Sequence, residues 1–291
     1  MIRHTGYFDL CIPETCISQG NVEQTLKILY NLGYRTIAIN QIIEDFNIEM
    51  KKKKKKRQPS DTLDAVPIPY NVDKVNDIAF NLGLVNFKVL NRLTIVFSSQ
   101  DILPKITKSP NYKKFDLVAV QPTTLQTFMF TCSTFEADIL TFDPENKYNI
   151  RLNRRLYNQL VDRGYHFELL YSPAIEDSTK RKNLIHVSHL YHSFGKSKNV
   201  FISSGAQNHM YFRSPYDIIN LGFIFGLSEE KSKNAVTCCP NRVIYNSVGR
   251  RHGKAVMFVE NIKDEHIVVD VSDNEDVVQD QPTQKKSKHA I

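Results

Sequence analysis

The sequence predicts an α/β fold in which about seven parallel strands alternate with helices, and this number of units fits a TIM-like barrel better than an open sheet. Three segments share one plan, in which a helical pattern stops at a glycine and an apolar strand follows. They read NLGYRTIAIN from residue 31, NLGLVNFKVL from residue 81 and DRGYHFELLY from residue 162. We expect Gly33, Gly83 and Gly164 to end these helices in the left-handed conformation.

Seven apolar, β-rich segments lie between helical patterns and are predicted to be strands of a parallel sheet that is covered on both faces. In chain order they span residues 7–12, 36–40, 93–97, 115–120, 138–142, 167–171 and 200–203. Apolar residues at helical spacing precede the second and third strands, for example Val22 and Leu26, or Val75 and Ala79. Because ligands bind beyond the carboxyl ends of parallel strands, function is expected on the loops that follow them.

The sixth predicted strand leads into a charged turn. In the stretch FELLYSPAIEDSTKRK, residues 167–182, the strand stops at Ser172 because the proline after it disfavours a helical conformation there. Asp177 or Ser178 can cap the helix that follows. The turn therefore brings three cations to the start of a helix.

Two stretches interrupt the alternation of helices and strands. In residues 49–69 a basic run is followed by Gln, Pro, Ser and Asp, which predicts a solvated loop inserted after the second strand. In residues 260–291, acidic residues and a final KKSK surround only short apolar stretches, which predicts a disordered tail. The barrel is expected within residues 1–250.

The composition sets limits on the class of protein. The 291 residues, 41% of them hydrophobic, suffice for one barrel of ordinary size, and the formal charge of +7 is concentrated in the basic run, so that the barrel itself is only mildly basic. Five cysteines form no CxxC pair and leave an odd number, which argues against a disulfide framework. No signal-peptide core or membrane-spanning stretch is present, so we expect a soluble, intracellular protein without a membrane partner.

Several kinds of catalytic site lack their sequence signals. The first strand reads YFDLCIP, with Asp9 but without the His-x-His pair that typically opens a hydrolytic metal barrel. Ser172, Ser203 and Ser204 follow strands, but no G-x-S-x-G elbow surrounds them. A Walker loop and a GxGxxG motif are both missing, so no nucleotide cofactor is predicted. Glu168 is expected to point into the barrel, where it would need a partner such as an arginine.

Three histidines, His186, His189 and His192, recur at helical spacing and are predicted to face outward, opposite the apolar residues of the same helix. No carboxylate or cysteine completes a metal site on this stripe, and the flanking lysines would repel a cation, so no metal is predicted. A solvated helix face and a basic stripe that meets RNA phosphate both stay open as interpretations.

Cations near loops and strand ends suit contacts with phosphate that position a nucleic acid without reading its bases. They are Arg92, Lys180, Arg181, Lys182, Arg213, Arg250 and Arg251.

The basic run has two functional interpretations, a nuclear import signal or a nucleic-acid tether, beside a merely flexible basic loop. We favour import, which is compatible with tethering. The residues concerned are Lys51, Lys52, Lys53, Lys54, Lys55, Lys56 and Arg57.

Taken together, these segments resemble a known family, the thirty-kilodalton TIM-barrel-like protein subunit of eukaryotic and archaeal ribonuclease P, shared in eukaryotes with ribonuclease MRP. The resemblance covers about residues 5–247. It is carried by FDLCIP, GYRTIAIN, NRLTIVF, FELLYSPAIEDSTKRK, NVFISSGA and RSPYDIINLGFIFGLS, in family order and spacing. The family is similar in fold to PHP-type metal phosphoesterases but lacks their histidine-rich site, as this chain does.

The resemblance implies a non-catalytic subunit without a cofactor, which supports the RNA-catalysed 5′ maturation of precursor tRNA and, in ribonuclease MRP, the processing of rRNA. Its partners would be the ribonuclease P or MRP RNA and small RRM-like protein subunits, with precursor tRNA contacted indirectly, in the nucleus and nucleolus. The family motifs carry RNA contact to Arg92, Lys180, Arg181 and Arg213, whereas Lys182, Arg250 and Arg251 are added on charge alone. This chain has Glu176 at a position where relatives often have a cation. A PHP-type phosphoesterase is the alternative.

Overall fold

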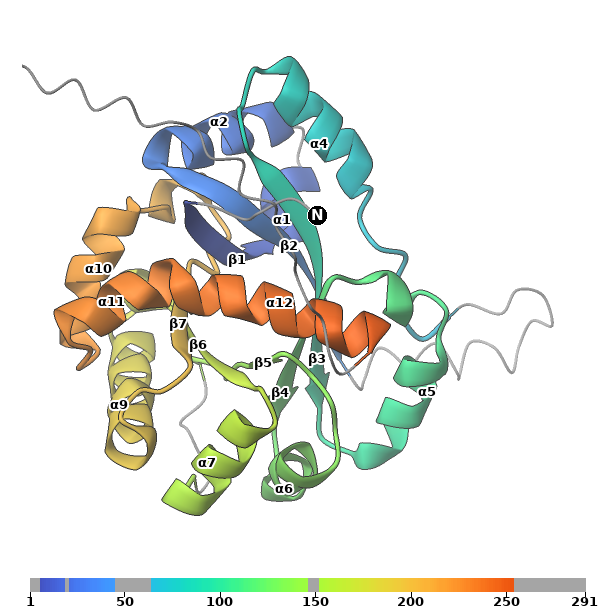
Figure 1. Cartoon of the computed structure of the whole chain (residues 1–291), viewed down its shortest axis with the longest axis vertical. Helices are drawn as coiled ribbons and strands as arrows, with labels where there is room; N and C mark the ends of the chain where they lie inside the picture. Colours follow the sequence, from blue (N-terminus) through green and yellow to red (C-terminus); the bar gives the residue numbers. More distant parts are fainter. Residues whose placement is uncertain (1–5, 19–20, 45–63, 146–151, 254–291) are drawn as a thin grey trace, which may run out of the picture. The chain divides into compact units, whose positions relative to one another are not determined.

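The computed structural model describes residues 6–18, 21–44, 64–145 and 152–253, and these form an α/β barrel (Figure 1). Seven strands follow one another around a single sheet, and each pairs in parallel with the next. The strands are β1 (Tyr7–Pro13), β2 (Tyr34–Glu44), β3 (Lys88–Phe97), β4 (Leu117–Pro122), β5 (Ile139–Leu140), β6 (His166–Leu170) and β7 (Val200–Ser203).

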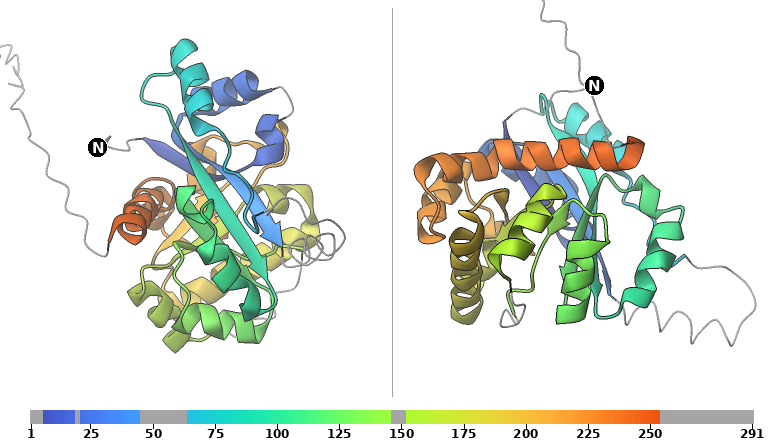
Figure 2. Two further views of the ribbon diagram at one scale, coloured as in Figure 1. Left: turned by 90° about the vertical axis from the view of Figure 1, so that its right-hand side faces the viewer. Right: turned by 60° about the horizontal axis from the view of Figure 1, so that its bottom comes forward.

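Contacts between β7 and β1 nearly close the sheet into a barrel (Figure 2). The backbone N–H of Gly205 donates to the carbonyl of Cys11 at 3.0 Å, and the N–H of Ser204 donates to Asp9 Oδ1 at 3.0 Å. Asp9 thus joins the first strand to the end of the last one. The TIM-like barrel predicted from the sequence is confirmed.

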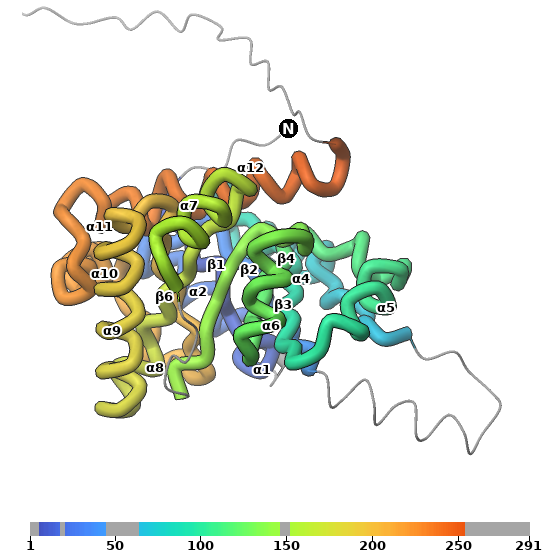
Figure 3. Tube along the Cα trace, turned by 90° about the horizontal axis from the view of Figure 1, so that it is seen from below, coloured from blue at the N-terminus to red at the C-terminus, as the bar shows by residue number. Residues whose placement is uncertain are grey.

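Helices alternate with the strands and pack around the outside of the sheet (Figure 3). Their apolar faces and the outward-facing residues of the strands form the larger of two hydrophobic clusters. The helices are α1 (Glu14–Ser18), α2 (Val22–Leu32), α4 (Val72–Asn81), α5 (Leu103–Lys108), α6 (Leu125–Ser133), α7 (Arg154–Asp162), α8 (Ser172–Glu176), α9 (Ser178–Gly195), α10 (Pro215–Ile224), α11 (Glu229–Val236) and α12 (Cys238–His252), with the short 3-10 turns η1 (Gln100–Ile102), η2 (Tyr112–Lys114) and η3 (His209–Tyr211).

Two of the predicted glycine stops show why this residue is needed. Gly33 has φ of 107° and Gly164 has φ of 85°, conformations that L side chains rarely adopt. The N–H of Gly33 donates back to the carbonyl of Tyr30 at 3.0 Å, and the chain then enters β2. Gly83, with φ of 72°, completes the set, so the predicted left-handed stops are confirmed.

The interior of the barrel has an apolar end and a polar middle. At the amino-terminal end, inward-facing side chains of the strands pack against Val243 and Ile244 of α12, which crosses this end of the barrel (Figure 2). Above this layer, towards the carboxyl ends, lie the buried polar side chains of Asn40, Arg92, Thr94 and Glu168. The amino-terminal end is therefore closed by a helix.

Predicted and observed strands differ in length. The strand predicted to begin at residue 93 starts at Lys88. Asn91 and Arg92 are polar and interrupt the apolar pattern in the sequence, but both lie within β3 and are buried. In the opposite sense, the strand predicted over 138–142 reduces to Ile139–Leu140.

The basic run and the tail that were predicted from composition lie outside the described residues. In the part of the chain that is described, no helix is both long and apolar enough to cross a membrane. All five cysteines are free, three of them are buried, and Cys238 is exposed.

Candidate nucleic-acid interface

Arg92 lies inside the barrel and cannot serve as a surface contact for phosphate. Its side chain is 1% exposed, and its two terminal nitrogens donate to the two carboxylate oxygens of Glu168 at 2.5 and 2.6 Å. The assignment of Arg92 to RNA is therefore wrong for this structure, because the guanidinium is shielded from solvent and already paired. The arginine partner expected for Glu168 is confirmed.

The surroundings of Arg92 accept two further hydrogen bonds from it. Nη1 also donates to the carbonyl of Leu10 at 2.8 Å, and Nε donates to Thr94 Oγ1 at 3.3 Å. Burial alone would lower the pKa of Arg92, but the acidic groups around it, Cys11, Glu168 and Asp9, raise it above its ordinary value. A permanent cation thus occupies the middle of the barrel.

Arg250 and Arg251 hold α12 against the amino-terminal end of the barrel. Arg250 Nη2 lies 3.0 Å from Asp138 Oδ2, and Arg251 Nη1 lies 2.8 Å from Asp116 Oδ1. Asp138 is buried just before β5, and burial raises its pKa while the guanidinium of Arg250 lowers it in part. Both arginines therefore have structural partners, a role that charge alone did not reveal.

The start of α9 gathers three of the predicted cations on one turn. Asp177 is the N-cap, since its side chain accepts from the N–H groups of Thr179 at 2.7 Å and Lys180 at 2.9 Å. These hydrogen bonds, that from Lys180 first, lower the pKa of Asp177. Of the two capping residues expected, the structure therefore selects Asp177 over Ser178.

The three cations of this turn differ in whether their side chains already have hydrogen-bond or ion-pair partners. Lys180 Nζ donates to Glu145 Oε1 at 2.8 Å, and Arg181 Nε donates to the carbonyl of Ala174 at 2.7 Å. Lys182 is exposed and forms no ion pair with any described residue. A phosphate would meet Lys182 without displacing an existing partner.

Arg213 lies after β7, on the carboxyl-end side of the barrel. Its Nη1 donates to the carbonyls of Met210 and Phe212, both at 2.9 Å, and its backbone N–H donates to the hydroxyl of Tyr171 at the end of β6. Arg213 and the start of α9 thus follow neighbouring strands, whereas Arg250 and Arg251 lie at the opposite end. The predicted cations form two groups rather than one surface.

The histidine stripe of α9 faces outward, as predicted. His186, His189 and His192 are exposed, while Val187 and Tyr191 on the other side are buried. Among the described residues no three side chains of His, Cys, Asp or Glu lie close enough together to hold a metal ion.

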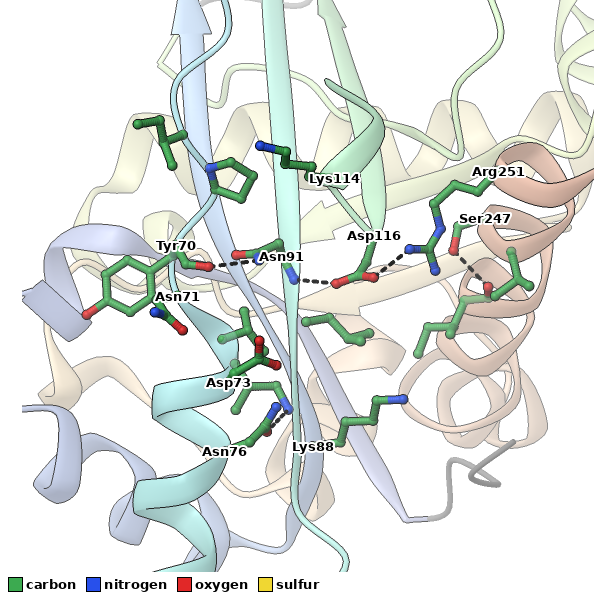
Figure 4. Close-up of a pocket in the computed structure, with 17 residues that line it drawn as sticks. Tyr70, Asn71, Asp73, Asn76, Lys88, Asn91, Lys114, Asp116, Ser247 and Arg251 are labelled. Atoms are coloured by element: carbon green, nitrogen blue, oxygen red, sulfur yellow. Dashed lines mark hydrogen bonds and ion pairs between the residues drawn. The ribbon is translucent and has the colours of Figure 1, made fainter. Parts of the chain in front are cut away.

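Sequence reasoning missed a polar cavity beside Arg251. Its lining includes Lys88, Asn91 and Lys114, which come from β3 and η2 (Figure 4). The quoted sequence segments contain Lys88 and Asn91 but give no sign of a cavity, and only the folded chain brings the three residues next to α12.

These features define a protein with a seven-stranded TIM-like barrel, an ion pair in its interior and groups of cations at both ends. The chain belongs to the RNase P subunit p30 family, whose model matches residues 6–252. That match includes every strand and helix described above.

Individual relatives agree with the family. The chain is 32% identical over 208 residues to the ribonuclease P protein subunit p30 of Mus musculus, which covers 71% of this chain and 73% of the relative. It is 25% identical to a ribonuclease P/MRP protein subunit of Saccharomyces cerevisiae, over 81% of this chain and 74% of that protein. A chain in the cryo-EM structure of archaeal ribonuclease P with mature tRNA is similar in fold, with a TM-score of 0.57 and 18% identity over 84% of this chain and 95% of that one.

Proposed function

We propose that the protein is a non-catalytic subunit of the ribonuclease P ribonucleoprotein, where it supports the RNA-catalysed maturation of the 5′ ends of precursor tRNA. The observation that carries this proposal is the family match over residues 6–252, which spans the whole barrel. The name of the Saccharomyces cerevisiae relative supports a second membership, in ribonuclease MRP. In that complex the protein would take part in rRNA processing.

The chemistry of the barrel supports a catalytic role for the RNA rather than the protein. A metal-dependent phosphoesterase needs several anionic or imidazole ligands that converge on its cation. Here the polar middle of the barrel holds the guanidinium of Arg92, a permanent cation that would repel a metal ion. A PHP-type metal phosphoesterase is therefore the weaker alternative.

Contact with RNA is assigned to the carboxyl-end cations, Lys180, Arg181, Lys182 and Arg213. They support the proposal because they lie on the loops and helix starts that follow β6 and β7. Arg250 and Arg251 are secondary candidates, since ion pairs with Asp138 and Asp116 already engage them. Small RRM-like subunits are the proposed protein partners.

A nuclear and nucleolar location follows from the proposed function, and the run from Lys51 to Arg57 is its proposed import signal. Deleting this run from a fluorescently tagged chain should leave the barrel folded and reduce nuclear accumulation. An unchanged distribution would remove the import role.

Association with RNA in cells tests the main proposal. A tagged copy should co-purify with the ribonuclease P and MRP RNAs when its bound RNA is sequenced, and depletion of the protein should cause precursor tRNAs with 5′ leaders to accumulate. Recovery of neither RNA would contradict the proposal.

The alternative is tested with the purified protein alone. We expect no hydrolysis of a phosphodiester with or without Mn²⁺. Metal-dependent turnover that disappears in Asp9→Ala would favour the phosphoesterase instead.

A further inference from the structure

A cavity of about 620 Å³ opens at the amino-terminal end of the barrel, between the first turn of α4, the beginning of β3 and one side of α12 (Figure 4). This volume is within the range of about 300–1,000 Å³ that small-molecule sites occupy. The cavity lies opposite the carboxyl ends of the strands, where ligands of parallel sheets usually bind. The usual ligand position of the fold therefore does not apply to this cavity, and its own lining residues determine what it can bind.

Three cations line the cavity from three separate elements. Lys88 begins β3, Lys114 ends η2, and Arg251 lies on α12 (Figure 4). Within the described part of the chain, no carboxylate pairs with either lysine, and Lys114 Nζ donates only to the neutral Asn111 Oδ1 at 3.1 Å. The two lysines are therefore available to an anion.

Hydrogen-bond acceptors line the same cavity. Asn91 is 8% exposed, and its amide Nδ2 donates to the carbonyl of Tyr70 at 2.9 Å. Asn91 Oδ1 is buried without a partner among the described residues. The exposed carboxylate of Asp73 lies close by, in the first turn of α4. A buried acceptor without a partner is unfavourable, so a ligand N–H that reaches Asn91 Oδ1 on binding would stabilise the complex.

The cavity also has an apolar surface. Leu90, Ile244 and Val248 are buried side chains that contribute to its lining. On the α12 side, Arg251 donates from Nη1 to Asp116, while its Nε is shielded and has no partner in the described chain. A flat ring could therefore lie on the apolar residues with polar groups on either side of it.

We propose that this cavity binds a single unpaired nucleotide of an RNA, with the base inside and the phosphates that flank it against Lys88 and Lys114, which lie on opposite sides of the cavity (Figure 4). An inorganic anion would satisfy the cations but not Asn91 Oδ1 or Asp73, whereas a nucleotide carries both a phosphate and N–H donors on its base. Only an unpaired nucleotide has a base edge free to enter, because pairing occupies that edge in a duplex. The inference rests on the proposed function, since it needs RNA as the partner.

The test compares binding of a short fluorescent single-stranded RNA with binding of the same strand annealed to its complement. In the purified full chain, the double variant Lys88→Ala/Lys114→Ala should weaken binding of the single strand roughly tenfold and leave the duplex almost unchanged. Lys27→Ala, which removes an exposed lysine of α2 away from the cavity, is the matched control and should change neither. Equal losses for both RNAs would overturn the proposal, because they would show a general electrostatic surface.

A second variant addresses the base itself. Asp73→Asn keeps the size of an exposed side chain but replaces one carboxylate oxygen, an acceptor, with an NH₂ donor. It should therefore weaken the binding of a single strand whose bases have exocyclic amino groups more than the binding of oligo-uridine. Cross-linking of a single strand that contains 4-thiouridine should label peptides from residues 68–76 or 244–251. Labels confined to other peptides would refute the site, whereas failure of the cellular RNA pull-down with cross-links intact would refute only the proposed function.

Discussion

Arg92 on β3 and Glu168 on β6 form a bidentate ion pair in the middle of the barrel, with N–O distances of 2.5 and 2.6 Å. Both side chains are buried, and each nitrogen of the guanidinium donates to at least one oxygen. Thr94, one of the acceptors, donates in turn to Asn40 Oδ1 at 2.6 Å, which extends the network to β2. Together with the hydrogen bond from Arg92 to the carbonyl of Leu10, the network connects four strands, β1, β2, β3 and β6, across the interior of the sheet.

Removal of one partner of this pair should destabilise the fold strongly. Arg92→Met leaves the carboxylate of Glu168 buried without a counter-charge, and the free energy of unfolding should fall by about 3–5 kcal/mol. Urea unfolding followed by circular dichroism measures this change. The double variant Arg92→Met/Glu168→Met should recover most of the loss, because two apolar side chains need no charge partner.

The same pair of variants separates a structural role from contact with RNA. If Arg92 acts inside the barrel, the folded double variant should bind RNA as the wild type does. A double variant that is stable but binds RNA more weakly would restore Arg92 as a surface contact and contradict the arrangement described here.

Asp9 should make the stability of the barrel depend on pH. Its carboxylate is buried, Oδ2 has no partner in the described chain, and burial raises its pKa from 3.8 to about 6. Because the folded state holds this proton more tightly than the unfolded state, the stability from Asp9 is fully present below pH 3.8 and is lost as the pH rises through about 6. A shift of about two units corresponds to about 3 kcal/mol.

The variant Asp9→Asn isolates this effect, since it keeps an acceptor for the N–H of Ser204 but does not titrate. Between about pH 4 and pH 7, the wild type should lose about 3 kcal/mol of stability relative to the variant. Urea unfolding at several pH values gives the difference. A difference that stays constant with pH would show that Asp9 keeps an ordinary pKa in the folded protein.

Much of the fold could be predicted because local patterns determine it. Glycines after helical patterns, apolar strands and the Ser-Pro stop each depend on a few neighbouring residues. Glu168 could even be placed inside the barrel and assigned an arginine partner. The identity of that partner could not be predicted, because it depends on how β3 and β6 face each other across a closed sheet.

The interface was harder to predict for the same reason. Arg92 was assigned to RNA by the family motifs and Arg250 on charge alone, yet acids distant in sequence, Glu168 and Asp138, pair with them. Lys180, Arg181 and Lys182 are adjacent in the chain, so their grouping on one turn was predictable. The cavity beside Arg251 gathers residues from several elements, and no sequence spacing could indicate it.

The cap of α9 makes a small and specific prediction. Asp177→Ala removes the acceptor for two backbone N–H groups and should lower the free energy of unfolding, and with it the urea midpoint. Ser178→Ala is the matched control, since Ser178 is the first residue of the helix and not its cap. Equal effects of the two substitutions on the urea midpoint would show that the cap is not the cause.

Substitution of Lys182 should change RNA binding, whereas substitution of Arg250 should change the stability of the fold. Lys182 is exposed and forms no ion pair with the described residues, so Lys182→Ala should leave stability unaltered and weaken RNA binding. If it neutralises one phosphate, the slope of log K against log salt concentration should decrease by about 1. Reversal of Lys180, Arg181 and Lys182 to Glu should lower both affinity and slope further.

Arg250→Ala should instead leave the buried carboxylate of Asp138 unpaired and lower the free energy of unfolding by about 3 kcal/mol. Its salt slope for RNA should match that of the wild type at temperatures where both are folded, because the guanidinium already has a partner within the protein. Filter binding across a salt series and thermal unfolding give the two quantities for both variants. An Arg250→Ala protein with unaltered stability and a reduced slope would move the RNA contact from the start of α9 to α12.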